Sequence, residues 1–274
     1  MEELIGKRIL VMDGAMGTLI PSATKDALNL TAPEQIQAIH RQYLNAGADI
    51  LKTNTFNSNS GPKDYEVNVA GARLARAVAD EFTARFVAGA MGPGRDGTAS
   101  ADAYFEQARG LVEGGVDMLL AETITSIRTA EAALTASEKL FAIIGRTLPV
   151  MLSVTVSKDG NLVSGETLTE FWNFVSSRNP FSVGINCSQG ARQSRTFIEQ
   201  LAAMASTRVS WHPSAGLPNA SGGYDETPEE FASLMANVVK NHGVSIVGGC
   251  CGTTPAHIRA IVDVVRARVT IDNL

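Results

Sequence analysis

The chain has 274 residues, a formal net charge of −5, 45% hydrophobic residues and 19% charged residues. This composition is enough for one sizeable core, and the mildly acidic balance argues against nucleic acid or an anionic membrane as the main partner. No apolar run approaches the roughly 18 residues of a membrane span, and residues 1–4 lack the basic and then apolar pattern of a signal peptide.

Eight short apolar runs predict strands, and most are followed by a helical pattern. The predicted strands cover residues 8–12, 48–53, 86–91, 116–121, 149–156, 181–186, 208–211 and 244–247. The predicted helices cover residues 33–46, 67–82, 101–113, 126–141, 169–177 and 194–205, with two more that begin at Thr227 and Pro255. Capping boxes are expected at residues 31–34 and 227–230.

Eight β-then-α units without a break in composition predict an α/β fold, a single (β/α)8 TIM barrel over residues 1–274. A prior of about 150 residues per domain would suggest two domains, but barrels of about 250 residues are single domains. A doubly wound open sheet is the alternative. That fold carries a glycine fingerprint after its first strand, which Gly14 and Gly17 match only in part.

The three cysteines all follow predicted strands. Cys187 closes the sixth strand, and Cys250 and Cys251 follow the eighth, with glycines on both sides of the pair. Neighbouring side chains on a regular strand point to opposite faces, so two adjacent cysteines reach one point only where glycines let the chain turn. Inward side chains of one barrel layer come from alternate strands, so strands six and eight can face one point. Three thiolates there predict a zinc site with one open position.

A zinc ion held by three thiolates suits the alkylation of a bound substrate thiolate, and three cysteines, an odd number, fit a reducing cytoplasm better than a disulfide framework. One alternative is that the cysteines are small buried hydrophobic residues. Another is a closed structural zinc site with His257 as the fourth ligand. His257 falls on the last predicted helix, where we expect it at the surface.

Other polar residues follow the predicted strands. Residues 13–18 (DGAMGT) form a glycine-rich turn whose backbone N–H groups could bind a carboxylate, or an ordinary tight turn. Glu122 could hold an ammonium group, or form a salt bridge or loop cap. Thr53, Asn54 and Asn186 could orient a ligand or satisfy loop backbone, and His212 is a base or, preferably, a satisfied structural histidine. Together these features predict a small amino acid bearing a thiol as the ligand.

Four segments resemble the homocysteine S-methyltransferase family: residues 13–18 (DGAMGT), 53–57 (TNTFN), 184–187 (GINC) and 248–255 (GGCCGTTP). Residues 212–219 and 224–228 are most similar to the homocysteine-binding module of cobalamin-dependent methionine synthase. The resemblance implies a zinc-bearing barrel that methylates homocysteine to methionine, with Cys187, Cys250 and Cys251 as catalytic zinc ligands. It also implies that the segment of Asp13, Gly14, Ala15 and Met16 receives the substrate carboxylate and that Glu122 meets the amino group.

The sequence shows no folate, corrinoid or activation domain of a methionine synthase. We therefore expect methylcobalamin on a separate corrinoid protein as the methyl donor, together with a separate folate-binding protein, and neither nucleic acid nor membrane as a partner. The loop over residues 214–226 is rich in small residues, and only 6% of the chain is aromatic, which does not suit a cage for a quaternary ammonium. The alternatives are a betaine or sulfonium donor, another thiol acceptor, or a non-catalytic protein that binds zinc or thiols.

Overall fold

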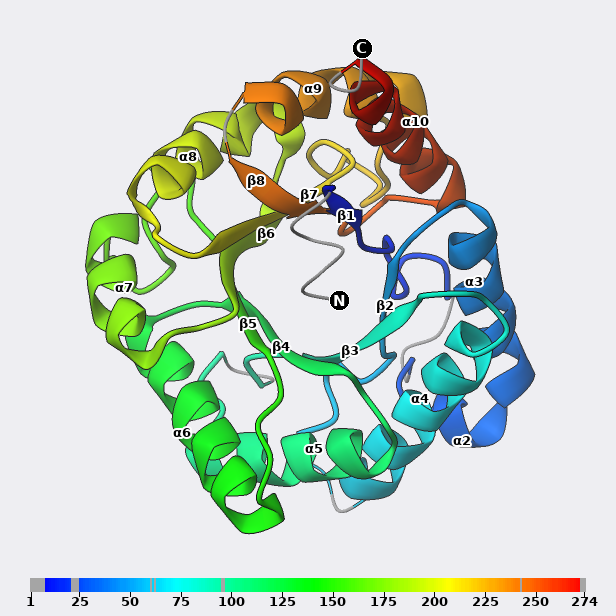
Figure 1. Ribbon diagram of the computed structural model, residues 1–274, viewed down its shortest axis with the longest axis vertical. Helices are drawn as coiled ribbons and strands as arrows, with labels where there is room; N and C mark the ends of the chain where they lie inside the picture. Colours follow the sequence, from blue (N-terminus) through cyan, green and yellow to red (C-terminus); the bar gives the residue numbers. More distant parts are fainter. Residues whose placement is uncertain are drawn as a thin grey trace.

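The computed structural model describes residues 8–20, 25–59, 61, 63–94, 97–241 and 243–271. Within them, eight parallel strands form one sheet in the order β1-β8-β7-β6-β5-β4-β3-β2, and a bridge between Met12 and Ile50 joins its two edges. Figure 1 shows the strands as a ring with the helices outside it. The predicted (β/α)8 barrel is confirmed, and the doubly wound open sheet is excluded.

The strands of the barrel are short and lie near their predicted positions. Their bounds are β1 Leu10–Val11, β2 Ile50–Lys52, β3 Phe86–Met91, β4 Met118–Ile124, β5 Val150–Val154, β6 Ser182–Gly190, β7 Arg208–Ser214 and β8 Val244–Val247. β7 runs on to Ser214. Two other strands also run further than predicted: β4 continues past Glu122 and β6 past Cys187. Both contain a register shift at that point, and Thr123 and Cys187 have positive φ angles of 59° and 58°. These irregularities turn the chain at the carboxyl ends of both strands.

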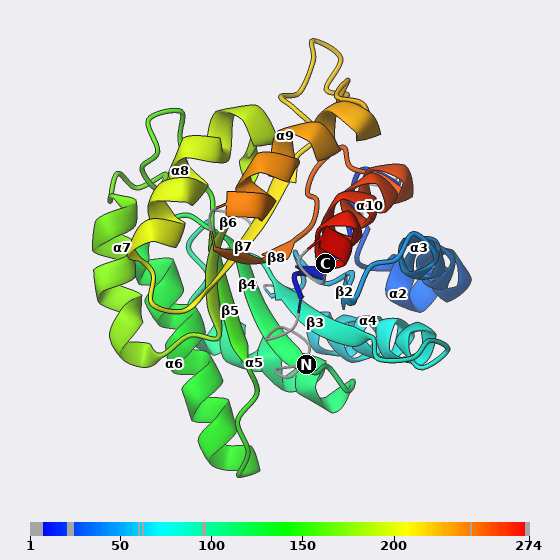
Figure 2. The same ribbon diagram turned by 45° about the horizontal axis from the view of Figure 1, so that its top comes forward.

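The helices surround the barrel, as Figure 2 shows from a second direction. Their bounds are α2 Leu28–Thr31, α3 Pro33–Asn45, α4 Asp64–Ala79, α5 Ala101–Glu113, α6 Ile127–Ile144, α7 Leu168–Val175, α8 Ala191–Met204, α9 Pro228–Asn241 and α10 Pro255–Ile271, with a 3₁₀ helix η1 at Ser176–Arg178. The capping box between Thr227 and Glu230 is confirmed. The one predicted at residues 31–34 is wrong, because Thr31 ends α2 and its hydroxyl donates to the carbonyl of Ala27.

Successive side chains along each strand point alternately into the barrel and out toward the helices, and this alternation produces two separate hydrophobic cores. Outward side chains pack under the helices, while inward side chains fill the barrel. The inward apolar cluster consists of Leu10, Met12, Ile50, Ala88, Met118, Leu120, Met151, Phe181 and Ile246. Ile50 and Leu120 are inward, so Lys52 and Glu122, two residues further along their strands, also point toward the axis. The barrel therefore brings charged side chains together at the carboxyl ends of its strands.

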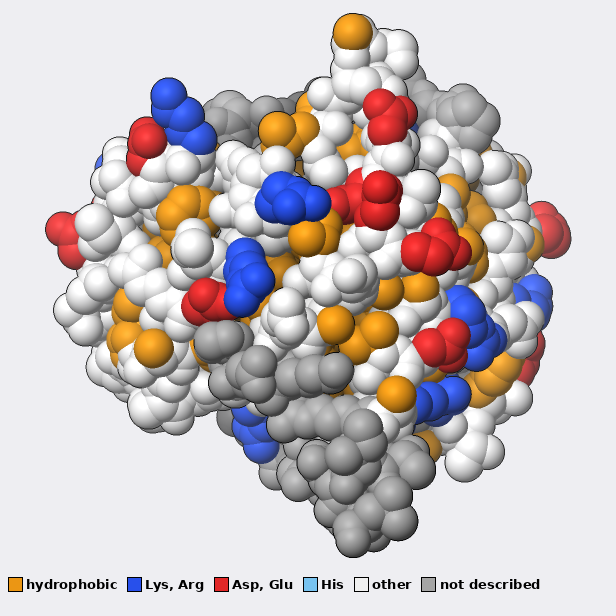
Figure 3. All heavy atoms as spheres, turned by 90° about the horizontal axis from the view of Figure 1, so that it is seen from above, with side chains coloured by type: hydrophobic (Ala, Val, Ile, Leu, Met, Phe, Trp, Pro, Cys, Tyr) orange, Lys and Arg blue, Asp and Glu red, His pale blue; other side chains and the backbone are white. Residues whose placement is uncertain are grey.

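One face of the molecule mixes both signs of charge. On the face in Figure 3, lysine and arginine side chains lie among aspartate and glutamate side chains and scattered hydrophobic ones. None of the helices within the described residues is long and apolar enough to cross a membrane.

Candidate metal and substrate site

Three sulfur atoms meet at the carboxyl ends of β6 and β8. The Sγ atoms of Cys187, Cys250 and Cys251 lie within 4.8 Å of one another, and those of Cys187 and Cys251 are 3.6 Å apart. Thiolates bound to one tetrahedral zinc ion at 2.3 Å lie about 3.8 Å apart, so this arrangement fits zinc with a fourth position left for a ligand. We call these three residues the sulfur wall.

The backbone around the sulfur wall is held by neighbouring strands. The N–H of Cys250 donates to the carbonyl of Pro213 at 2.8 Å, and the carbonyl of Cys251 accepts from Ala215 at 2.9 Å. Gly252 follows with a φ of 79°, and a Cβ there would lie 2.3 Å from the ring of Tyr224. The turn that lets two adjacent cysteines serve one site therefore requires glycine at position 252.

Hydrogen bonds link the thiol groups to one another. Bonds from Cys187 and Cys250 lower the pKa of Cys251, and the same sharing raises the pKa of Cys250. Tyr224, from the loop between β7 and α9, also interacts with the thiol of Cys251 and lowers its pKa further. The sulfur wall thus favours one thiolate before any metal is considered, which is the form that binds zinc.

A pocket of about 400 Å³ opens beside the sulfur wall. Its described lining residues come from the ends of β1, β2, β4, β6 and β8 and are Asp13, Gly14, Ala15, Met16, Gly17, Thr18, Lys25, Asp26, Lys52, Thr53, Asn54, Thr55, Phe56, Asn57, Glu122, Thr123, Cys187, Cys250 and Cys251. A larger cavity of about 660 Å³ lies near the amino ends of β5, β6 and β7, lined in part by Pro149, Pro180 and Arg208. We place the candidate site in the smaller pocket, because it contains the cysteines and buried charges.

Asp13, Lys52 and Glu122 line the same pocket as the cysteines, and we call these three residues the charged wall. The side chain of Asp13 accepts from the backbone N–H of Lys52 at 2.9 Å, and its Oδ1 lies 3.4 Å from the Nζ of Lys52. The carboxylate of Glu122 is 6% exposed and has no hydrogen-bond partner among the described residues. A buried carboxylate without a partner, facing a pocket, is suited to a cationic ligand group.

Burial acts differently on the three charges. It raises the pKa of Asp13 to about 6, despite the attraction of Lys52, and it raises the pKa of Glu122. Burial alone would lower the pKa of Lys52, but the attraction of Asp13, Glu122 and Cys250 outweighs it and raises that pKa. Lys52 is therefore firmly protonated at neutral pH, and Asp13 is ionised with little margin.

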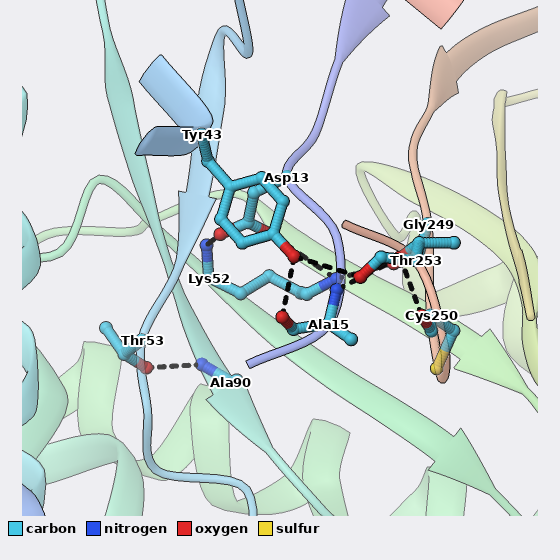
Figure 4. A network of polar contacts seen from close by, with 9 residues as sticks. All are labelled: Asp13, Ala15, Tyr43, Lys52, Thr53, Ala90, Gly249, Cys250 and Thr253. Carbon is cyan, nitrogen blue, oxygen red and sulfur yellow. Dashed lines mark hydrogen bonds and ion pairs between the residues drawn. The ribbon is translucent and has the colours of Figure 1, made fainter. Parts of the chain in front are cut away.

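A buried hydrogen-bond network ties the turn after β1 to the turn after β8 (Figure 4). The hydroxyl of Tyr43 donates to the carbonyl of Ala15 at 2.6 Å and lies 3.2 Å from the carbonyl of Thr253. The hydroxyl of Thr253 accepts from the N–H of Ala15 and donates to the carbonyl of Cys250. A Cβ on Gly14 would lie 2.6 Å from this hydroxyl, so glycine allows the two turns to approach. The network fixes the 13–16 segment relative to the sulfur wall.

The other predicted polar residues hold neighbouring loops. Thr53 Oγ1 accepts from the N–H of Ala90 at 2.9 Å, and the amide of Asn54 donates to the carbonyl of Lys25 at 2.9 Å. The side chain of Asn186 bonds to both the N–H and the hydroxyl of Thr123, and Asn186 does not line the pocket. Thr53 and Asn54 do line the pocket, so any role of these three residues in ligand binding stays a prediction.

Two histidines differ from their predicted settings. His257 is buried, not exposed, because its ring nitrogens contact the hydroxyl of Thr254 and the carbonyl of Glu226 and its ring packs edge-on against Phe231. His212 was expected to be satisfied, but it is fully buried in the barrel and neither ring nitrogen has a partner among the described residues. Burial lowers the pKa of His212, so its imidazole is neutral.

Sequence reasoning missed Lys52, Tyr43, Thr253 and the contact of Tyr224 with Cys251. One signal was available for Lys52, since it is a lysine at an inward position of an otherwise apolar strand, two residues after Ile50. Tyr43 left no comparable signal, because its partners at Ala15 and Thr253 lie 28 and 210 positions away.

Comparison with known proteins places this geometry among related proteins. A family profile described as homocysteine S-methyltransferase matches residues 10–265. The oxidised and metallated forms of the homocysteine methyltransferase MmuM from Escherichia coli each superpose with a TM-score of 0.80, at 21% identity over 97% of this chain and 98% of theirs. An octameric Rubisco from Pyrococcus horikoshii OT3 superposes with a TM-score of 0.60, at 14% identity over 100% of this chain and 62% of that one. At these identities the superpositions show the fold.

Proposed function

The chain belongs to the homocysteine S-methyltransferase family, and on that premise we propose that it transfers a methyl group to the thiol of homocysteine, giving methionine. The proposal depends above all on one observation: three sulfur atoms meet beside a pocket that contains the unpartnered carboxylate of Glu122. Zinc bound by Cys187, Cys250 and Cys251 would supply the positive charge that keeps an acceptor thiol deprotonated at neutral pH.

The residues around the metal ligands bind and orient the amino acid in this proposal. Glu122 accepts hydrogen bonds from the ammonium group of homocysteine, which gives its buried charge a partner. Gly14 and Met16 line the pocket, and their backbone N–H groups have no acceptor among the described residues, so these groups bind the carboxylate in this proposal. Tyr43 and Thr253 keep this segment at a fixed distance from the sulfur wall.

We further propose methylcobalamin, carried by a separate corrinoid protein and supplied through a separate folate-binding protein, as the methyl donor. Phe56 is the one aromatic side chain among the described residues of the pocket lining, whereas a quaternary ammonium cage needs several. The loop between β7 and α9 projects from the rim (Figure 2), and its Leu217 is 49% exposed. Val163, on the loop after β5, is 65% exposed. The support for a donor presented by another protein is the sparse aromatic lining of the pocket.

The test is to supply zinc-loaded protein with homocysteine and one donor at a time and to measure methionine. In each reaction an S–CH3 bond forms, the bond between the methyl group and the donor breaks, and the donor keeps its electron pair when the methyl group moves as a cation to the thiolate. We expect turnover with methylcobalamin, free or on a corrinoid protein, and none with glycine betaine or a sulfonium compound.

The other outcomes separate the alternatives. Turnover only with betaine or a sulfonium donor would overturn the corrinoid proposal and keep the homocysteine methyltransferase. Faster methylation of a different thiol would show that homocysteine is not the preferred methyl acceptor. Stoichiometric binding of homocysteine without methionine from any donor would identify a protein that binds zinc and thiols without catalysis.

A further inference from the structure

Lys52 belongs to the charged wall, and it lines the pocket together with the sulfur wall. It ends β2, and alternation from the inward Ile50 directs its side chain to the barrel axis. The side chain is 11% exposed, and the residue lines the same pocket as Glu122 and the cysteines. A lysine is rarely buried unless its charge is used, so this position calls for an explanation.

The contacts of Lys52 leave hydrogen-bonding capacity unused. Its Nζ donates to the carbonyl of Gly249 at 3.1 Å and lies 3.4 Å from the Oδ1 of Asp13 (Figure 4). That Oδ1 has no hydrogen-bond partner, so the 3.4 Å contact is an ion pair without a full hydrogen bond. An ammonium group has three N–H donors, and at least one therefore remains for a pocket ligand.

The surrounding charge indicates which ligand group that donor would take. Asp13 and Glu122 are negative, and a zinc ion bound by three thiolates would add a further formal negative charge. A substrate carboxylate entering this pocket needs a positive partner, and the free N–H groups of the 13–16 segment offer only partial charges. The lysine supplies a full charge next to Asp13, the first residue of that segment.

Lys25 is the second lysine of the pocket lining, and it is the competing candidate. It is half-buried at the rim, where its Nζ would lie 3.5 Å from a Cβ on Gly17. Lys52 is better placed to select a ligand, because a buried charge is screened less by water and salt than one at the rim.

We propose that Lys52 is a specificity-determining residue that binds the carboxylate of the thiol substrate, so that the pocket selects a 2-amino-4-mercapto acid over the same aminothiol without its carboxylate. This inference deepens the proposed function and rests on it. Glu122 and Lys52 then bind the two charged groups of a zwitterion, and the cysteines of the sulfur wall line the same pocket.

The test compares homocysteine with 3-aminopropanethiol, which is homocysteine without its carboxylate. Affinities are measured by calorimetry on zinc-loaded wild-type protein, Lys52→Met and Lys25→Met, and the zinc content of each is measured in parallel. Lys52→Met should weaken homocysteine about 10- to 100-fold and change the affinity for 3-aminopropanethiol less than about threefold. Lys25→Met should keep the wild-type ratio of the two affinities.

Two outcomes would overturn the inference: an equal loss for both ligands in Lys52→Met, which indicates a structural role, or a collapse of the ratio in Lys25→Met instead. If Lys52→Met does not fold because Asp13 is left buried and unpaired, the neutral double variant Asp13→Asn/Lys52→Met gives the same ratio test. Lys52→Arg should keep the preference for the carboxylate, and its loss there would also contradict the inference.

Failure of the inference can be distinguished from failure of the proposed function. If wild-type protein binds homocysteine and forms methionine, but Lys52→Met keeps the wild-type ratio of affinities, only the role of Lys52 is wrong. If wild-type protein does not bind homocysteine at all, the proposed acceptor is wrong.

Discussion

The sulfur wall and the charged wall reach the same pocket by different means. The sulfur wall depends on unusual backbone, with φ angles of 58° at Cys187 and 79° at Gly252 and a register shift in β6. The charged wall uses inward positions on or just beyond β1, β2 and β4, of which only β4 has a register shift, and its main cost is the burial of Asp13, Lys52 and Glu122. The sulfur wall therefore depends mainly on backbone conformation, whereas the charged wall depends mainly on the electrostatics of buried side chains.

The difference also determines what each wall needs to be complete. The three sulfur atoms already lie at distances that suit one metal ion, so metal binding requires little rearrangement. The charged wall is only partly satisfied, because Glu122 and the Oδ1 of Asp13 have no hydrogen-bond partner among the described residues. We expect changes to the sulfur wall to act first on metal content, and changes to the charged wall to act on ligand binding and on the dependence of stability on pH.

The largest effect is expected from Cys251→Ala. Cys251 shares a hydrogen bond with Cys187, its thiol interacts with Cys250 and Tyr224, and it is one of three ligands in the proposed zinc site. The variant should lose bound zinc and all methyl transfer, as should wild-type protein treated with a chelator. The barrel should persist, because Cys251 lies outside both apolar cores. Metal analysis and circular dichroism provide the two measurements, and stoichiometric zinc with full activity would exclude this ligand set.

The protonation of Asp13, in the charged wall, can be tested through the dependence of the free energy of unfolding on pH. Burial raises its pKa from 3.8 to about 6, so the folded state holds the proton more tightly than the unfolded state. Its contribution to stability is therefore full below about pH 4 and is lost as the pH rises through about 6. A difference of about two pH units between the two pKa values corresponds to about 3 kcal/mol.

Asp13→Asn isolates this contribution, because asparagine does not titrate. The free energy of unfolding of the wild type minus that of Asp13→Asn should fall by up to about 3 kcal/mol between pH 4 and pH 7. Urea titrations of metal-free, reduced protein measure it without interference from metal release. A difference that stays constant over this range would show that Asp13 is ionised in the folded state throughout.

Glu122→Gln should affect ligand binding without affecting the sulfur wall. The substitution keeps the shape of the side chain and removes its charge, so homocysteine should bind about 10- to 100-fold more weakly, as expected for a charge-assisted hydrogen bond of about 1.5–3 kcal/mol. Zinc content should match the wild type. Glu138→Gln is the control, since that carboxylate pairs with Arg178 at the other end of the barrel. Unaltered homocysteine affinity in Glu122→Gln would show that Glu122 does not bind the ammonium group of the substrate.

The sequence predicted the sulfur wall more completely than the charged wall for a physical reason. The cysteine pair, its glycines and the helix start at Pro255 are contiguous, so the turn can be inferred locally. The pairing of Asp13 with Lys52 joins residues 39 positions apart, and its strength depends on burial that no local pattern encodes. The burial of His257 has the same origin, because it depends on packing against Phe231. The barrel itself was predictable, since its periodic units repeat along the chain.

Gly252→Ala would alter the backbone of the sulfur wall without removing a sulfur atom. Of the substitutions expected to weaken ligand or metal binding, it should have the smallest effect on that binding. Two costs act together: a φ of 79° strains alanine, and its Cβ would lie 2.3 Å from the ring of Tyr224. Gly145→Ala separates them, because Gly145 has a φ of 69° with nothing within 4 Å of a Cβ. Both variants should lose about 1 kcal/mol of stability from backbone strain, and Gly252→Ala should lose more because its Cβ would contact Tyr224. Only Gly252→Ala should also weaken zinc binding, by roughly tenfold, because Tyr224 and the turn at Cys251 must move apart. Competition with a chromophoric chelator measures the zinc affinity of both, and equal affinities would show that the metal site tolerates a shift of this turn.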